Sequence, residues 1–437
     1  MDNKNFLRRS LDSVWHPCTQ MKRHETWPLL PIESGQGIWL KDFNGKRYLD
    51  AVSSWWVNLF GHCNPRINAA ITDQLGKLEH VMLAGFSHEP VVQLSERLAA
   101  LAPTGLGHCF YASDGASATE IALKMSAHYW RNVGKREKVG FVSLQQSYHG
   151  ETLGALSVTD VALFKEAYSP LVKHNATVES PDWRRAEVGE NAEGYALRSA
   201  EALESHLQLH GDKLAALIIE PLVQGAAGMA MYHPAYLQRA RELCDRYQVH
   251  LIADEIAVGM GRTGTMFACE QAGIRPDFLL LSKGITGGYL PLSIVMTTDT
   301  VYQAFYDDDV ARAFLHSHSY TGNPLACRAA LATLDIFEQD NVLDANRAKA
   351  ACLNEMASSL REHPAVRDFR NTGMIWAFEV DTQHTDFSQR SFTLGLEYGL
   401  LLRPMGNTVY FMPPYVIEEE EIQLLLEGTL SVIETLA

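Results

Sequence analysis

The sequence lacks the features that mark membrane-spanning, secreted or repeat proteins. No apolar run approaches the ~18 residues of a membrane span. The N-terminal residues contain no apolar signal core. There is also no repeat at solenoid spacing and no low-complexity linker. Together these absences predict a cytoplasmic protein.

Paired cysteines and concentrated basic charge are also missing. The seven cysteines are odd in number and form no Cys-x-x-Cys pair: Cys18, Cys63, Cys109, Cys244, Cys269, Cys327 and Cys352. This pattern predicts thiols in a reducing compartment, most of them small buried side chains. The formal net charge is −15, and the basic residues form no dominant block. Nucleic acid and anionic membranes are therefore unsuitable as the main partner.

The middle of the chain alternates short apolar runs with amphipathic helical patterns. The 437 residues are 46% hydrophobic and 20% charged, which is typical of a globular protein with a large and a smaller domain. The apolar runs are 108–112, 138–144, 214–220, 249–254 and 278–281, with helices expected at 118–130 and 234–247. This alternation predicts an α/β fold with an open, mostly parallel sheet. A hairpin is expected within 37–50 and a smaller α+β domain from about residue 331.

Two of these runs end in ionisable residues. Lys283 follows the run at 278–281 and is itself followed by glycines, whereas Asp254 ends the run at 249–254. Partial burial there would lower the pKa of the lysine and favour a nucleophilic amine. A pyridoxal phosphate (PLP) enzyme needs one lysine to bind the cofactor and one carboxylate to keep its pyridine nitrogen protonated. Separately, each residue could be an ordinary surface lysine or a strand-end carboxylate.

The glycine-rich stretch at 259–264 matches G-x-G-x-x-G and raises the alternative of a dinucleotide site. That motif requires a helix directly after it and a strand ending in an acid ~20 residues later. Here the next strand begins with Asp277 and ends at Lys283. A loop that holds Arg262 near a cofactor fits the pattern better.

Several other positions suggest ligand contacts. A helix that begins near Gly115 and Ala116 could bind a phosphate, although a plain helix cap has the same pattern. Tyr148 could stack on a planar ring, and Arg403 could bind a carboxylate through two hydrogen bonds. The run His316-Ser317-His318-Ser319 invites a metal site, but no third ligand cluster has metal spacing, so we expect no metal.

Taken together, these residues resemble the class III aminotransferases of PLP fold type I along nearly the whole chain. The matching landmarks, in order, are Gly115-Ala116, Tyr148-His149-Gly150, Glu220-Pro221, Asp254-Glu255, Gly261-Arg262-Thr263-Gly264, Lys283 and Thr321-Gly322-Asn323-Pro324. The resemblance implies a homodimer with shared active sites. It also implies an N-terminal segment at 1–60 that joins the small domain, a large PLP-binding domain at 61–330, and a C-terminal small domain at 331–437.

The resemblance also implies roles for individual residues. Lys283 would carry PLP, Asp254 would contact the pyridine nitrogen, and Tyr148 would stack on the ring. The phosphate would be held by Gly115 and Ala116, together with His318 and Ser319 donated across the dimer interface. The substrate would contact Trp55, Tyr148, Lys283, Ser317, Arg403, Tyr415 and Cys18. Cys18 departs from the tyrosine found there in many members.

A narrower resemblance points to the branch of the family that acts in biotin synthesis. It rests on Trp15-His16-Pro17, Ser53-Ser54-Trp55-Trp56, Ala257, Arg403-Pro404 and Met412-Pro413-Pro414-Tyr415. It implies S-adenosylmethionine as amino donor and 8-amino-7-oxononanoate as acceptor, with the acceptor carboxylate on Arg403. Three alternatives stay open: lysine as donor, an ω-amino acid:pyruvate transaminase, and a non-catalytic PLP-binding protein.

Overall fold

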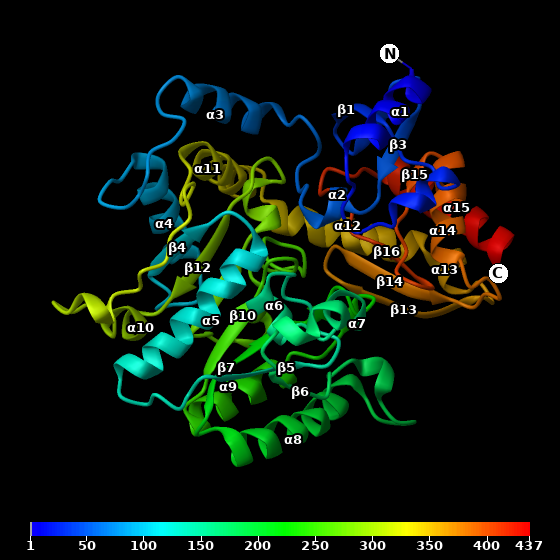
Figure 1. The fold of residues 1–437 in the computed structure, drawn as a ribbon. Coiled ribbons are helices and arrows are strands. Elements are labelled where there is room, and N and C mark those ends of the chain that lie inside the picture. Colours follow the sequence, from blue (N-terminus) through cyan, green and yellow to red (C-terminus); the bar gives the residue numbers. More distant parts are fainter. Residues whose placement is uncertain (1) are drawn as a thin grey trace. The chain divides into compact units, whose positions relative to one another are not determined.

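The computed structural model describes residues 2–437, which form two compact units (Figure 1). The small unit combines residues 2–68 with Asp344–Ala437, and the large unit is Ala69–Leu343. The domain boundaries expected after residues 60 and 330 stay predictions. Within residues 2–437, no helix combines the length and the apolar character needed to cross a membrane.

The large unit is built on a seven-stranded sheet. Its strand order is β4 (His108–Ala112), β12 (Ser293–Thr297), β11 (Phe278–Leu281), β10 (His250–Asp254), β7 (Leu214–Ile219), β5 (Gly140–Leu144) and β6 (Ala176–Val178). The pairs from β11 through β6 are parallel, whereas β12 is antiparallel to both of its neighbours. The predicted α/β fold with a mostly parallel sheet is confirmed. Strand β12 was not among the predicted apolar runs.

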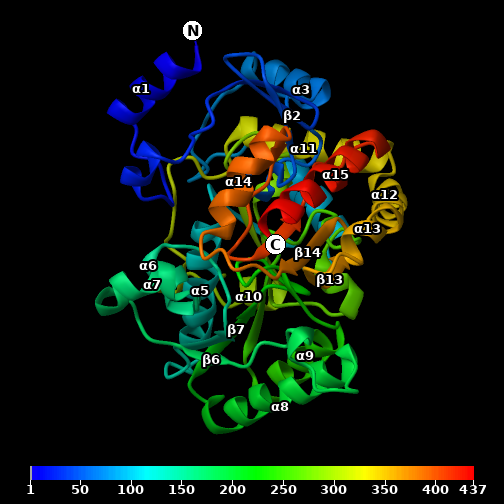
Figure 2. The same cartoon turned by 90° about the vertical axis from the view of Figure 1, so that its right-hand side faces the viewer.

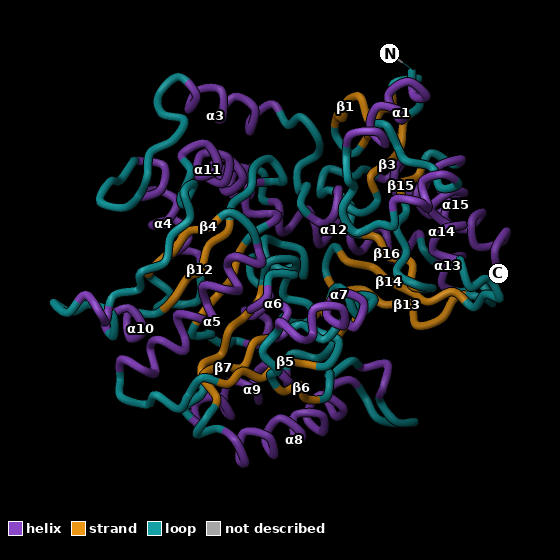
Figure 3. The backbone as a smooth tube through the Cα atoms, in the orientation of Figure 1, coloured by secondary structure: helices purple, strands orange, loops and turns teal. Residues whose placement is uncertain are grey.

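Helices cover both faces of this sheet, which explains its uninterrupted apolar strands. All residues of β7, β10 and β11 are buried, as expected for parallel strands covered on both sides. Helix α5 (Gly115–Asn132) lies on one side of the strands and α9 (Ala235–Tyr247), which packs on α8 (Ala192–His210), lies on the other (Figures 2 and 3).

The remaining elements of the large unit are short connections and peripheral helices. They are α4 (Glu89–Leu101), α6 (Leu153–Val158), α7 (Ala162–Lys165), β8 (Val223–Gln224), β9 (Ala230–Met231), α10 (Asp299–Gln303) and α11 (Pro324–Gln339), with 3₁₀ turns at Glu166–Leu171, Trp183–Arg185, Ala268–Ala272, Lys283–Thr286 and Val310–Arg312. Two helices span the unit boundaries: α3 (Pro65–Leu75) and α12 (Val342–Met356).

The small unit contains two antiparallel hairpins from opposite ends of the chain. The predicted N-terminal hairpin is present as β2 (Trp39–Asp42) and β3 (Arg47–Asp50), in a sheet with β1 (Ile32–Gln36) and β15 (Leu400–Leu401). A second sheet joins β13 (Val366–Thr372), β14 (Ile375–Val380) and β16 (Thr408–Phe411). The helices are α1 (Asn3–Ser13), α2 (Ser53–Trp56), α13 (Ser358–Arg361), α14 (Phe387–Glu397) and α15 (Glu419–Leu436), with a 3₁₀ turn at Met21–Glu25.

Candidate active site

The end of β11 places Lys283 in a tight turn. Its backbone has a φ of 47°, and its side chain is half-buried. Ser282 donates from Oγ to the carbonyl of Leu292 at 2.8 Å, which fixes the entry to the turn. Burial lowers the pKa of Lys283 to about 8, although the carboxylates of Asp254 and Glu220 oppose this shift. A substantial fraction of this amine is therefore neutral near physiological pH.

Asp254 ends β10, the strand next to β11, so sheet pairing brings it to the same edge as Lys283. Asp254 pairs with Leu280 in the parallel register. Its carboxyl group is 4% exposed and accepts a hydrogen bond from the backbone N–H of Ile256 at 3.2 Å. The predicted proximity of these two strand ends follows from the register.

His149 holds the other oxygen of Asp254, a contact that the sequence did not predict. His149 Nδ1 lies 2.6 Å from Asp254 Oδ2, and both side chains are buried. The backbone of His149 is fixed by the hydroxyl groups of Thr119 and Thr159, at 2.9 and 3.0 Å. His149 Nε2 is buried and has no hydrogen-bond partner within residues 2–437. The sequence feature that could have indicated His149 is its position next to Tyr148, for which a role was predicted.

Glu220 is a second ionisable group whose role the sequence did not predict. Its carboxyl group accepts hydrogen bonds from the backbone N–H of Tyr148 at 3.1 Å and of Gly225 at 3.0 Å. The pKa of Glu220 is raised to about 7, mainly by burial; His149 opposes the shift, and the charge of Asp254 adds to it. Near pH 7, this carboxyl group is therefore ionised in some molecules and neutral in others.

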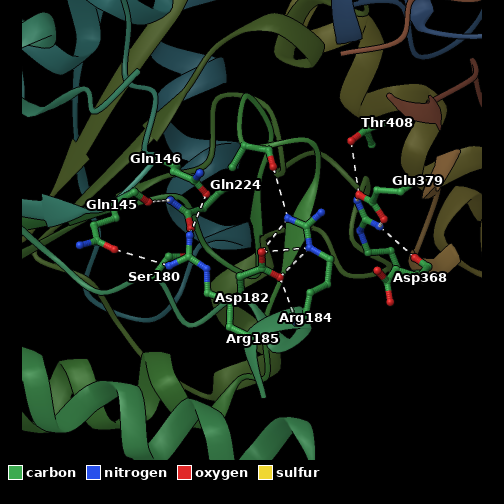
Figure 4. Close-up of polar contacts among 12 residues, drawn as sticks. Gln145, Gln146, Ser180, Asp182, Arg184, Arg185, Gln224, Asp368, Glu379 and Thr408 are labelled. Carbon is green, nitrogen blue, oxygen red and sulfur yellow. Dashed lines mark hydrogen bonds and ion pairs between the residues drawn. The ribbon is translucent and has the colours of Figure 1, made fainter. Parts of the chain in front are cut away.

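The loop that contacts Glu220 is anchored by polar side chains. Gln224 donates to the backbone carbonyl of Gln145 at 3.1 Å and accepts a hydrogen bond from Ser180. Figure 4 shows these residues beside the ion pair between Arg184 and Asp182, which is 2.6 Å long. These contacts hold the segments that follow β5, β6 and β7.

The N-terminus of α5 forms a closely packed cradle at the same edge of the sheet. The helix begins at Gly115, and the first N–H groups of a helix have no partner within the helix. A Cβ atom on Gly115 would lie 3.0 Å from Ile256 Cγ2. Gly150, whose φ is 120°, packs so closely that a Cβ atom there would lie 2.6 Å from Ala116 Cβ. This geometry leaves backbone N–H groups available for an anion.

Two further predicted positions of the large unit lie in loops. Tyr148 donates from its hydroxyl group to Glu151 at 2.9 Å, and its ring contacts Phe164 edge-on. The segment with Ser317, His318 and Ser319 precedes α11, and both serines are exposed. No cluster of three or more histidine, cysteine or carboxylate side chains in residues 2–437 could hold a metal ion.

In the small unit, the structure brings Trp55 and Arg403 together. The Arg403 guanidinium lies over the Trp55 ring, 4.5 Å from its centroid, and both side chains are exposed. Cys18 is exposed, whereas Tyr415 is buried with its ring edge-on to Phe60. Trp55, Arg403 and Cys18 are therefore open to solvent, whereas Tyr415 is not.

Trp55 lies in a strained backbone turn. The four residues of α2, Ser53 to Trp56, have φ values of 50°, 46°, 74° and 71°, so the turn is left-handed. This conformation costs a non-glycine residue roughly 1–2 kcal/mol. Strained backbone of this kind persists where the surrounding structure determines it, and it concentrates at functional sites.

The comparisons with known proteins agree on one family. The sequence profile described as aminotransferase class-III matches residues 20–433. An adenosylmethionine-8-amino-7-oxononanoate aminotransferase from Helicobacter pylori is 48% identical, over 99% of this chain and 98% of the relative.

Solved structures agree with the sequence comparison. The crystal structure of an enzyme with the same name from Methanocaldococcus jannaschii has a TM-score of 0.93 at 35% identity, covering 99% of this chain and 100% of that chain. A PLP-bound amine transaminase from an uncultivated Pseudomonas species has a TM-score of 0.90 at 29% identity, covering 97% and 99%. The resemblance inferred from the sequence is therefore confirmed, and the chain belongs to the class III aminotransferases.

Proposed function

We propose that this aminotransferase uses PLP to move an amino group from S-adenosylmethionine to 8-amino-7-oxononanoate, giving 7,8-diaminononanoate in biotin synthesis. The observation that carries the proposal is the half-buried Lys283 amine beside the Asp254 carboxylate, at the carboxyl edge of the sheet. The names of the Helicobacter and Methanocaldococcus relatives support the choice of substrates.

The residues at this edge fit PLP. Lys283 offers an amine, Asp254 a buried carboxylate, Tyr148 an aromatic ring, and Gly115 and Ala116 the N–H groups of a helix start. When bound, PLP supplies an electron sink that stabilises negative charge on the substrate carbon. The PLP-bound Pseudomonas neighbour supports the same cofactor.

In this proposal, the Lys283 amine accepts and donates the proton that is transferred at the substrate carbon. Its pKa of about 8 lets it act as a base when neutral and as an acid when protonated, close to working pH. The Asp254 carboxylate, which His149 contacts at 2.6 Å, would supply the negative charge that keeps the pyridine nitrogen of bound PLP protonated. The charge of Glu220 also raises the pKa of Lys283.

The proposed recognition of the acceptor rests on the residues that the family resemblance implies. We propose that Arg403 binds its carboxylate through two hydrogen bonds, and that Trp55 packs along its carbon chain. Tyr148, Ser317, Cys18 and Tyr415 are proposed as further substrate contacts. Cys18 can offer a thiol where many members offer a tyrosine hydroxyl group.

We also propose a homodimer in which His318 and Ser319 complete the phosphate site of the other subunit. The loop and short helix before them carry exposed apolar side chains, including Tyr306 and Leu315, which a second subunit would cover. Sizing by light scattering tests the dimer, and mixing a Lys283→Ala chain with a Ser319→Ala chain tests shared sites. The same proposal places PLP in the domain at 61–330 and the enzyme in the cytoplasm.

One experiment separates the candidate donors and acceptors. Purified enzyme in the PLP form is mixed with S-adenosylmethionine, with lysine, or with a simple amine, and conversion to the pyridoxamine form is followed by absorbance. We expect rapid conversion with S-adenosylmethionine, followed by return to the PLP form on addition of 8-amino-7-oxononanoate. If lysine converts the enzyme and S-adenosylmethionine does not, the proposed donor is wrong.

The amine transaminase neighbour supports a second candidate function. If simple amines convert the enzyme and pyruvate returns it to the PLP form, while 8-amino-7-oxononanoate does not, that function replaces the first. A protein that binds PLP but converts with no donor would contradict both.

A further inference from the structure

The left-handed turn of α2 is held by the carboxyl group of Asp50. This side chain is fully buried at the end of β3. Its Oδ1 accepts from the backbone N–H of Ser54 at 2.9 Å and from that of Val52 at 3.4 Å. Its Oδ2 accepts from the Ser54 hydroxyl group at 2.7 Å. One carboxylate therefore bonds both the backbone and the side chain of a residue at φ 46°.

His62 completes this arrangement on the other side. His62 Nε2 lies 3.0 Å from Asp50 Oδ2, and His62 Nδ1 lies 3.1 Å from the Asn58 side-chain amide. The imidazole ring thus bridges the buried carboxyl group and the chain that leaves the turn. Hydrogen bonds to a buried carboxylate are stronger than those between neutral groups, so Asp50 can hold a conformation that its neighbours would not adopt alone.

The two ends of the turn are attached to the second sheet of the small unit. Ser53 donates from Oγ to the carbonyl of Met412 at 2.7 Å, directly after β16. The indole N–H of Trp56 donates to the Tyr410 hydroxyl group at 3.2 Å. Between these anchors, the turn directs Trp55 outward beneath the Arg403 guanidinium. A guanidinium that stacks by its face keeps its N–H groups free at the edge.

We propose that Asp50, with His62, is a positioning residue that sets specificity for a carboxylate-bearing substrate by holding Trp55 under Arg403. The proposal rests on the proposed function, in which Arg403 binds the acceptor carboxylate. Asp50 does not touch the substrate. It fixes the turn, the turn fixes the indole ring, and the ring holds the guanidinium in one orientation. Loss of Asp50 would release the guanidinium and weaken recognition of the carboxylate rather than the chemical step.

The test compares 8-amino-7-oxononanoate with its methyl ester as acceptors of the holoenzyme. The ratio of kcat/KM for the acid over the ester measures recognition of the carboxylate. We expect a ratio of about 10–100 in the unchanged enzyme, the range for hydrogen bonds to a charged group. In Asp50→Asn the ratio should fall about tenfold, through a higher KM for the acid, with kcat for the ester unchanged.

Ser54→Ala guards against failure of Asp50→Asn to fold, because it removes only the hydroxyl group. It should lower the same ratio about threefold, since one of several hydrogen bonds is lost. The matched control is Asp42→Asn. Asp42 is also a buried carboxylate of the small unit, and it accepts from Asn44, Lys46 and Tyr48 without contacting the turn. This control should lose stability and keep the ratio.

The outcomes are distinct. An unchanged enzyme that prefers the acid, with folded Asp50→Asn and Ser54→Ala variants that lose the preference, supports the inference. The inference is overturned if both folded variants keep the full preference, or if Asp42→Asn lowers it equally. An unchanged enzyme with no preference for the acid overturns the proposed role of Arg403 instead, and the inference with it.

Discussion

Lys283 in the large unit and Trp55 in the small unit both lie on backbone with positive φ, but the two regions hold this strain by different means. Lys283 is a single such residue, with a φ of 47°, directly after a fully buried parallel strand. Trp55 belongs to four successive residues with positive φ that lie outside any sheet. The first region depends on strand pairing and the second on side chains that bond backbone groups.

The two regions should therefore tolerate different substitutions. At the sheet edge, the buried strands fix the positions of the side chains. Substitutions there should therefore change the charge and the proton transfer more than the backbone geometry. At the turn, position is secured by Asp50 and its partners, so substitutions should change geometry first. The following predictions test this contrast.

The largest effect is expected at Lys283. Lys283→Ala should lower turnover at least about a thousandfold, because the proposed base and the proposed attachment point for the cofactor are lost together. Turnover and the unfolding temperature are measured side by side. The matched control is Lys138→Met, a buried lysine whose pKa burial also lowers to about 8 and whose amine donates to the Leu214 carbonyl. It should lose stability and keep turnover, and equal loss of activity in both variants would contradict the contrast.

A smaller effect is expected from Glu220 in the apoenzyme. Its folded pKa of about 7 lies above the usual value near 4.5, so the folded state holds more protons between these two pH values. Stability from this group is therefore full below pH 4.5 and is lost as pH rises through 7. Replacement by Gln should remove up to about 3 kcal/mol of this dependence. Denaturant unfolding at pH 5 and pH 8 measures it, with Glu193→Gln, on the exposed start of α8, as control.

The coupling between Asp254 and Lys283 should appear as a pKa change. In the apoenzyme, an amine-selective reagent should report a pKa of about 8 for Lys283. In Asp254→Asn this pKa should fall, because a negative charge that favours the ammonium form is lost. Asp277→Asn, just before the opposite end of β11, serves as control. A higher or unchanged pKa in Asp254→Asn would show that the carboxylate does not act on the lysine.

The smallest effect compares two exposed residues with positive φ. Gln248 caps the C-terminus of α9 with a φ of 54°, and its side chain accepts an exposed hydrogen bond from Lys135 rather than bonding a buried carboxylate. Gln248→Gly should therefore raise the free energy of unfolding by about 0.5–1 kcal/mol. Ser54→Gly relieves similar strain but loses a hydrogen bond to a buried carboxylate, worth about 1.5–3 kcal/mol. It should therefore destabilise the protein. Denaturant midpoints decide the sign, and stabilisation by both changes would contradict the role given to Asp50.

The sequence predicted the sheet edge better than the turn, for physical reasons. Uninterrupted apolar runs indicate buried strands, and parallel strands bring their carboxyl ends together, so Asp254 and Lys283 could be placed in advance. His149 and Glu220 were missed because their contacts bridge segments 72 to 105 residues apart. The assignments of Tyr148, Ser317 and the other site residues stay predictions.

The handedness of α2 had no sequence signal at all. No glycine lies within it, and its anchors at Met412 and Tyr410 come more than 350 residues later. Likewise, β12 was not among the predicted apolar runs, and its direction follows only from its pairing with β4 and β11. Long-range partners, rather than local preference, decide such features.

The pairing of β3 with β15 imposes an order on biosynthesis. Leu49 and Asp50 meet Leu400 and Leu401, so the two halves of this small sheet leave the ribosome some 350 residues apart. The large unit, by contrast, is one continuous segment and can complete its own sheet during synthesis. The edge of β3 must therefore stay unprotected until Leu400 and Leu401 have emerged. Unprotected edges of this kind attract other chains, so the segment that contains β3 is exposed to aggregation during synthesis.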